Sequence, residues 1–253
     1  LDWTLGSASA TVVGLGNYVT FFTSADAPEV LGTTAVFTLV TVGGSMVLGL
    51  LVALALNSKV RGTTFARSAV FAPYVLSGVG VGLVWLFIFD PGYGVLAWLL
   101  RGIGQQSPQW INDPQLSLVM VITVYVWKNL GYCAVVYLAG LQSLPPDVME
   151  AAALDGANGF RRFVNMSLPL LSPTTFFLLI TTMLSSLQAF DLIRIMTPLG
   201  NGTSTLIYEA YLQAFGAFNR AGYSAAISVV LFAILLIITV FQLRFVERKV
   251  HYS

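Results

Sequence analysis

Five long apolar stretches, separated by polar connections, constrain this chain more than any other feature of its sequence. They are Thr34–Asn57, Ser68–Phe89, Leu116–Leu141, Thr174–Met196 and Tyr223–Phe245. A helix needs about 20 apolar residues to cross roughly 30 Å of hydrocarbon, and a helix satisfies its own backbone hydrogen bonds there. We therefore predict an all-α membrane protein. It would be a polytopic bundle with five visible transmembrane helices, forming a single transmembrane domain over residues 1–253.

The composition supports a membrane protein and excludes several classes of function. Of the 253 residues, 57% are hydrophobic and only 9% are charged, whereas soluble domains carry about 25% charged residues. The net charge is +1 with no basic stripe, so no nucleic-acid partner is expected. The chain has one cysteine, Cys133, and one histidine, His251. A metal cluster or a Ser-His-Asp triad is therefore improbable, and we assign no metal site and no catalytic residue.

The lysines show that the chain has no P-loop for nucleotide phosphates. Such a loop needs a Lys followed by Ser or Thr after a glycine-rich turn. The three lysines are followed by Val60, Asn129 and Val250. We expect no cofactor in this chain, so any ATP and magnesium that drive its function would be bound by a partner subunit.

Basic residues alternate between the connections, which predicts the orientation in the membrane. Cytoplasmic loops carry the excess of Lys and Arg. Eight of the twelve basic residues lie after the first stretch, after the third and in the tail: Lys59, Arg61, Arg67, Arg161, Arg162, Arg244, Arg248 and Lys249. The N-terminus and the connections 90–115 and 198–222 are therefore predicted to lie outside. In the outer connections, 95–103 and 205–218 have helical spacing of apolar residues and could lie at the interface or form a docking floor for an external partner.

The segment 142–173 is a polar connection that reads as two short helices around a tight turn. Pro145-Pro146 suits a helix start, and Asp155-Gly156 suits its end. Asn158 can cap the second helix, and Phe160, Phe163 and Val164 then form one apolar stripe. Pro169 and Pro173 are expected to close the element.

This segment resembles the EAA loop of ABC importer permeases. The matching residues are Glu150, Ala151, Ala152, Asp155, Gly156, Ala157, Leu168 and Pro169. The resemblance implies that 142–173 is a cytoplasmic coupling loop that docks into a cleft of an ATPase subunit. The implied ATPase-coupling residues are Glu150, Ala151, Ala152, Asp155, Gly156, Ala157, Arg161 and Arg162.

The resemblance extends over nearly the whole chain. Phe190-Asp191 and Thr197 are similar to a pattern of sugar-importer permeases, although Pro198–Gly202 replaces the usual glycine-rich G-G-P. Phe89-Asp90-Pro91-Gly92, Val126-Trp127-Lys128 and the ending Phe245–Val250 resemble the A-type permease of glycerol-3-phosphate and glycerophosphodiester importers. Members of that family carry one further N-terminal span, so six are expected in the full chain.

The resemblance implies partners, a substrate class and a location. The partners are a second homologous permease, two ATP-binding cassette ATPases and an extracytoplasmic solute-binding protein, in the bacterial cytoplasmic membrane. The substrate would be glycerol-3-phosphate or a glycerophosphodiester such as glycerophosphocholine. A di- or oligosaccharide such as trehalose or maltose is the alternative within the family. An ion-coupled secondary transporter and a purely structural scaffold are alternatives from other classes.

Lys128 is the most unusual polar residue inside the apolar stretches. It lies near the middle of the third stretch, where a charge costs about 2.5–3.5 kcal/mol even on lenient scales. It should therefore face the interior, where it could meet a phosphate, pair with an acid such as Asp191, or bond to backbone carbonyls. Trp127, Tyr132 and Asp191 complete the candidate substrate path. Asp191 and Arg194 lie one turn apart and could form a local ion pair or line an outer gate.

Overall fold

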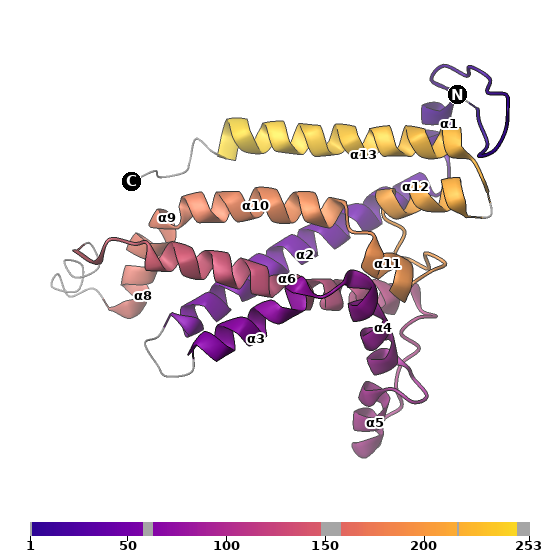
Figure 1. The fold of residues 1–253 in the computed structure, drawn as a ribbon. Helices are drawn as coiled ribbons and strands as arrows, with labels where there is room; N and C mark the ends of the chain where they lie inside the picture. The colour runs from indigo at the N-terminus through magenta and orange to yellow at the C-terminus, as the bar shows by residue number, and fades with distance from the viewer. Residues whose placement is uncertain (1, 58–62, 148–157, 217, 247–253) are drawn as a thin grey trace. The chain divides into compact units, whose positions relative to one another are not determined.

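A computed structural model describes residues 2–57, 63–147, 158–216 and 218–246. Figure 1 shows the helices in chain order. The helices up to Gln142 are α1 (Gly16–Thr23), α2 (Ala27–Leu56), α3 (Thr63–Val75), α4 (Gly78–Phe89), α5 (Val95–Gly102) and α6 (Pro114–Gln142). Those after it are α8 (Gly159–Arg162), η1 (Phe163–Ser167), α9 (Leu168–Leu170), α10 (Ser172–Leu187), α11 (Asp191–Met196), α12 (Leu206–Phe215), α13 (Ala221–Phe241) and η2 (Gln242–Val246). The described residues hold no strand beyond one isolated bridge between Asp2 and Thr11, which confirms the all-α prediction.

Four helices are long and apolar enough to cross a membrane by themselves: Ala27–Leu56, Pro114–Gln142, Ser172–Met196 and Ala221–Arg244. Thr63–Val75 and Gly78–Phe89 form a pair bent by 98°, and the number of candidate spans rises to five if this pair counts as one span. The structure thus agrees with the prediction of five spans, but the spans begin and end at other residues than predicted. The first helix begins at Ala27, before the predicted Thr34, because the polar residues of its first turns do not interrupt the helix.

The prediction of one continuous second span over Ser68–Phe89 is wrong. The chain leaves the helical region at Ser77, with φ −55° and ψ 133°, between α3 and α4. Pro73 already removes one backbone donor in the last turn of α3. The predicted fourth span is also interrupted, between Leu187 and Asp191, where the sequence holds no proline or glycine to indicate it.

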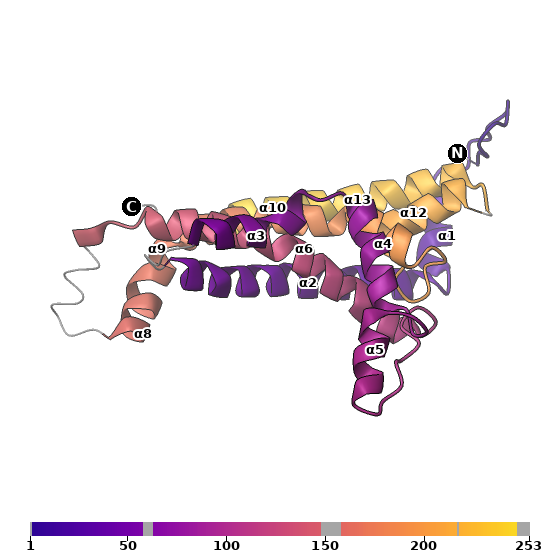
Figure 2. The ribbon, with the colours of Figure 1, turned by 60° about the horizontal axis from the view of Figure 1, so that its bottom comes forward.

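The chain forms two compact units. The first comprises Leu1–Thr41, Leu76–Tyr125 and Leu184–Leu236, and the second Val42–Val75, Val126–Met183 and Ile237–Ser253. In the first unit α4 is followed by α5 (Figure 2), and α11 packs against α4. Gly82 permits this packing, because a Cβ there would lie 2.9 Å from Cγ2 of Ile195.

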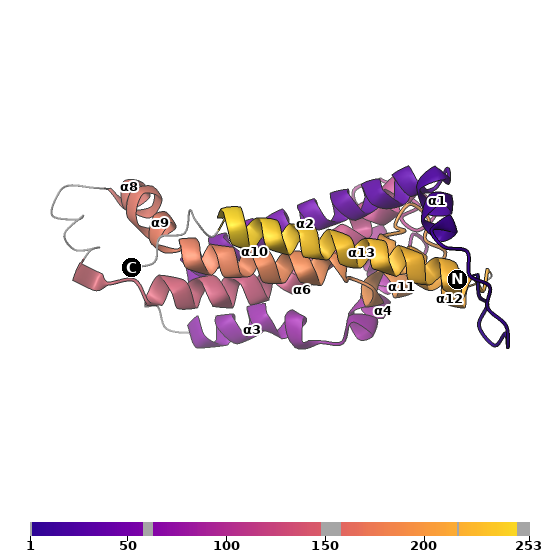
Figure 3. The same ribbon diagram turned by 90° about the horizontal axis from the view of Figure 1, so that it is seen from above.

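In the second unit α6 lies between α3 and α10 (Figure 3). Three glycines bring helices close: a Cβ at Gly49 would lie 2.5 Å from Cβ of Cys133, one at Gly140 would lie 2.7 Å from Oγ1 of Thr174, and one at Gly131 would overlap the carbonyl of Val70. Small residues at helix contacts are typical of membrane bundles, where dispersion forces must replace the hydrophobic effect. The core of this unit consists of Ala53, Cys133, Tyr137, Leu138, Leu141, Leu171 and Leu178.

Candidate functional site

Lys128 binds the broken end of α3. Its Nζ donates a hydrogen bond of 2.8 Å to the carbonyl oxygen of Tyr74, and it lies 5.4 Å from the centre of the Tyr74 ring. In a continuous helix this carbonyl would accept from residue 78, but α3 ends at Val75. A cation is also favourable at the negative end of the helix dipole. The carbonyl bond that was one of the alternatives for Lys128 is thus observed.

The residues beside Lys128 on α6 hold α3 in place. Tyr132, one turn later, stacks on Tyr74 with ring centres 4.9 Å apart and planes 17° apart. Its hydroxyl contacts Oγ1 of Thr181 on α10 at 3.4 Å. Gly131, between them, lets the α3 backbone approach α6 directly. Lys128 and Tyr132 are therefore brought together around the end of α3, while Trp127 lies half-buried on the same helix.

Asp191 and Arg194 belong to the first unit and do not pair with each other within the described part of the chain. Asp191 lies at the start of α4: a Cβ on Gly78 would be 3.0 Å from Cβ of Asp191 and 3.3 Å from its Oδ2. The positive end of the α4 dipole is favourable for this carboxylate. Arg194 lies instead over Tyr211 and Phe190, 4.8 Å and 5.8 Å from their ring centres. Of the two alternatives, the local ion pair is not observed between these described residues, and Arg194 lies over aromatic rings instead.

The coupling segment is described only in part. Glu150, Ala151, Ala152, Asp155, Gly156 and Ala157 lie outside the described residues. Asn158 caps α8 as predicted, since its Oδ1 accepts a hydrogen bond of 2.9 Å from the backbone N–H of Arg161. Arg161 is exposed and Arg162 half-buried. Phe160 is 76% exposed and Val164 39% exposed, so part of the apolar stripe has no cover from the described residues.

The helical run over α8, η1 and α9 ends at Leu170, after Pro169, and α10 begins at Ser172, before Pro173, which agrees with the prediction that these prolines close the element. The N–H of Thr175 bonds to the carbonyl of Leu171 at 2.8 Å, at the start of α10. The wider π-helical turn of η1 precedes Pro169. Such a turn can accommodate a ring that would clash with the carbonyl four residues earlier in a regular helix.

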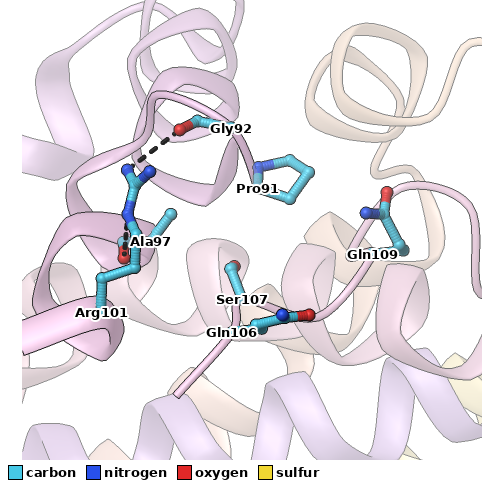
Figure 4. Close-up of a pocket in the computed structure, with 7 residues that line it drawn as sticks. All are labelled: Pro91, Gly92, Ala97, Arg101, Gln106, Ser107 and Gln109. Carbon is cyan, nitrogen blue, oxygen red and sulfur yellow. Dashed lines mark hydrogen bonds between the residues drawn. The ribbon is translucent and has the colours of Figure 1, made fainter. Parts of the chain in front are cut away.

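The outer connections contain the two predicted helices, α5 and α12. Beside α5 is an open, polar pocket of about 450 Å³, lined by Pro91, Gly92, Ala97, Arg101, Gln106, Ser107 and Gln109 (Figure 4). Arg101 is held by the carbonyl oxygens of Gly92 and Ala97, at 3.0 Å and 3.2 Å. Buried Tyr208 on α12 donates a hydrogen bond of 2.7 Å to the carbonyl oxygen of Pro198. Burial and Tyr211 raise the pKa of Tyr208, which Arg194 opposes, so its hydroxyl remains a neutral donor.

Buried polar contacts between apolar stretches were not predicted. Thr41 on α2 and Ser186 on α10, both within the first unit, form a hydrogen bond of 2.7 Å. Both are almost fully buried. Hydroxyls inside apolar stretches are the signal for such contacts, but the sequence does not say which pairs meet.

Comparisons with known proteins agree on one family. A family model described as "Binding-protein-dependent transport system inner membrane component" matches residues 45–252. The sn-glycerol-3-phosphate transport system permease protein UgpA of Agrobacterium fabrum (strain C58 / ATCC 33970) is 38% identical over 248 residues, which covers 97% of this chain and 84% of that protein. The protein of the same name from Yersinia pestis is 35% identical, covering 97% of this chain and 83% of its own length.

The fold also matches solved structures. A bacterial ABC transporter involved in the import of the acidic polysaccharide alginate superposes with a TM-score of 0.87 at 22% identity, covering 95% of this chain and 85% of the other. A bacterial alginate ABC transporter in complex with an alginate pentasaccharide-bound periplasmic protein gives a TM-score of 0.85 at 23% identity, covering 95% of this chain and 85% of the other. At this identity the likeness concerns the fold alone.

Proposed function

Because this chain belongs to the binding-protein-dependent transport system inner membrane components, we propose that it is one of two permease halves of an ATP-driven importer for sn-glycerol-3-phosphate or glycerophosphodiesters. It is a multi-pass protein of the cytoplasmic membrane. The proposed partners are a second, similar permease, two ATP-binding cassette ATPases that bind ATP and magnesium, and an external solute-binding protein.

The identity of 38% over 97% of the chain to a relative named for sn-glycerol-3-phosphate transport carries the choice of substrate. Lys128 is compatible with it, because an ammonium group inside the membrane domain can receive a phosphate. The contact between Lys128 and the Tyr74 carbonyl suggests how such a group would act. A phosphate that competes for the ammonium would free the end of α3, so that solute and helix position become coupled.

The coupling role is assigned to residues 142–173. Glu150, Ala151, Ala152, Asp155, Gly156 and Ala157 would contact the ATPase, with Gly156 allowing the turn and Arg161 and Arg162 beside it. The exposed Phe160 side chain supports this role, because an apolar stripe without cover in its own chain suits a partner surface. The short helices α8, η1 and α9 lead into α10 across Leu171, so closure of the ATPases on this segment would tilt α10 and open the bundle outward.

Family membership argues against the ion-coupled transporter and the scaffold, since members depend on a binding protein for transport. The saccharide alternative differs from the proposal only in the solute that is carried.

Vesicles with the reconstituted importer, its ATPases and its binding protein would distinguish phosphate esters from saccharides as the solute. We expect ATP-dependent uptake of sn-glycerol-3-phosphate or glycerophosphocholine. Uptake of maltose or trehalose with neither phosphate ester carried would overturn the substrate assignment.

The same vesicles test the coupling loop. Gly156→Phe should leave the importer assembled but separate ATP hydrolysis from uptake, because the bulky side chain blocks the docking turn. Unchanged coupling with normal assembly would remove residues 142–173 from the proposed contact.

A further inference from the structure

Arg194 occupies an unusual position in the first unit. Its guanidinium lies over the rings of Tyr211 and Phe190, 4.8 Å and 5.8 Å from their centres, while the residue remains exposed. Such contacts cover one face of the guanidinium and leave its N–H groups at the edge available for hydrogen bonds.

The aromatic support beneath Arg194 is itself held in place. Phe190 meets Tyr211 edge-on at 4.9 Å, and Tyr208 lies parallel to Tyr211 at 6.1 Å with planes 12° apart. The hydroxyl of buried Tyr208 is bonded to the carbonyl of Pro198, and the backbone N–H of Leu206, at the start of α12, donates to Oγ1 of Thr34 at 2.9 Å. The guanidinium therefore rests on a preorganised surface, which lowers the entropy cost of binding.

The charge of Arg194 has no anionic partner among the residues that the structure describes. The nearest acid along the chain, Asp191, lies one turn earlier but at the start of α4, beside Gly78. The α4 dipole partly offsets the charge of that carboxylate. The fold thus separates two opposite charges that helical spacing would have allowed to pair.

We propose that Arg194, with Tyr211 and Phe190, forms a binding site for the phosphate group of the solute near the outer end of the fourth span. A guanidinium fork matches two phosphate oxygens, and the rings beneath it orient the fork. The alternation of basic residues predicts that the connection 198–222 lies outside. Solute released from outside would meet this site, which is distinct from Lys128 on α6. The inference rests on the proposed function for its choice of phosphate ester.

Binding can be measured without transport. The complete importer in nanodiscs, without binding protein, is titrated with inorganic phosphate and with sn-glycerol-3-phosphate, and binding is followed by ³¹P line broadening. We expect Arg194→Gln to weaken the binding of both by about fivefold to tenfold, and Arg194→Lys to be intermediate, because one bidentate charge-assisted contact is lost or reduced. Arg220→Gln is the matched control. Arg220 is also exposed and lies over a tyrosine, 4.4 Å from the Tyr223 ring centre.

The outcomes are distinct. A loss with Arg194→Gln but not with Arg220→Gln supports the site. Equal losses would indicate general surface charge, and no loss would remove Arg194 from anion binding; either overturns the proposal. A loss of binding-protein-stimulated ATPase activity with unchanged phosphate binding would also overturn it, in favour of a docking role. If the importer carries no phosphate ester but inorganic phosphate binding still depends on Arg194, the substrate assignment fails while the site stands.

Discussion

Replacing Gly131 by alanine should separate α3 from α6. A Cβ at this position would overlap the carbonyl oxygen of Val70 and lie 3.0 Å from the carbon of that carbonyl and 3.1 Å from Cα of Phe71. All three atoms are backbone, so no side-chain rotation can relieve the contact. Since ordinary C···O contacts are about 3.3–3.6 Å, α3 must move by roughly 1 Å.

The cost of this movement follows from what lies beside Gly131. Overpacking costs about 1–3 kcal/mol. The hydrogen bond from Lys128 to Tyr74, now 2.8 Å, would be stretched beyond bonding distance, which costs about 1.5–3 kcal/mol for a charged donor. Alanine regains about 1 kcal/mol of helix propensity over glycine. We therefore expect a net destabilisation of about 2–5 kcal/mol.

The assay is denaturant or thermal unfolding of the purified importer, with Gly43→Ala as the matched control. Gly43 is also in a long helix, α2, but a Cβ there would meet nothing within 4 Å. The control should be neutral or stabilised by up to about 1 kcal/mol. If Gly131→Ala unfolds at the same point as Gly43→Ala, the close approach of α3 and α6 is not as described.

Two further predictions concern single side chains. Lys128→Met loses a hydrogen bond and a ring contact worth about 2–4 kcal/mol but also removes a charge that costs about 2.5–3.5 kcal/mol in the membrane. The free energy of unfolding should therefore change by less than about 1.5 kcal/mol, while uptake of the phosphate ester falls at least tenfold. Unchanged uptake with normal assembly would show that Lys128 takes no part in transport. Asn158→Ala removes the cap of α8 and should cost about 1 kcal/mol locally, seen as faster backbone hydrogen exchange over Gly159–Arg162, whereas Asn158→Asp should preserve protection.

The membrane class, the helical content and the cap at Asn158 were predictable because each depends on residues close together in the sequence. The apolar length of α6 predicts a span, and an Asn before α8 predicts its cap, without knowledge of any distant contact. The interruption before α11 was not predictable in this way. Its residues carry no helix-breaking signal, and helix propensity is a weak preference that tertiary packing overrides.

The partners of the charged residues were equally beyond the sequence. Helical spacing allowed Asp191 and Arg194 to pair, and the need to bury Lys128 left three partners open. The break after Val75 exposes the carbonyl that Lys128 binds. Asp191 lies beside Gly78 at the start of α4, and Arg194 lies over the ring of Tyr211.

The sequence by itself therefore determined the number of apolar segments long enough to span a membrane and the family that the chain resembles, since these depend on local polarity and on motif, and it predicts the side that each connection faces. Only the tertiary structure decided where α3 breaks, what Lys128 binds and why Arg194 rests on aromatic rings. Those outcomes depend on which backbone groups lose their helical hydrogen bonds and on which side chains from distant segments lie within bonding distance. Neither can be read from a single position of the sequence, because both depend on residues far apart along the chain.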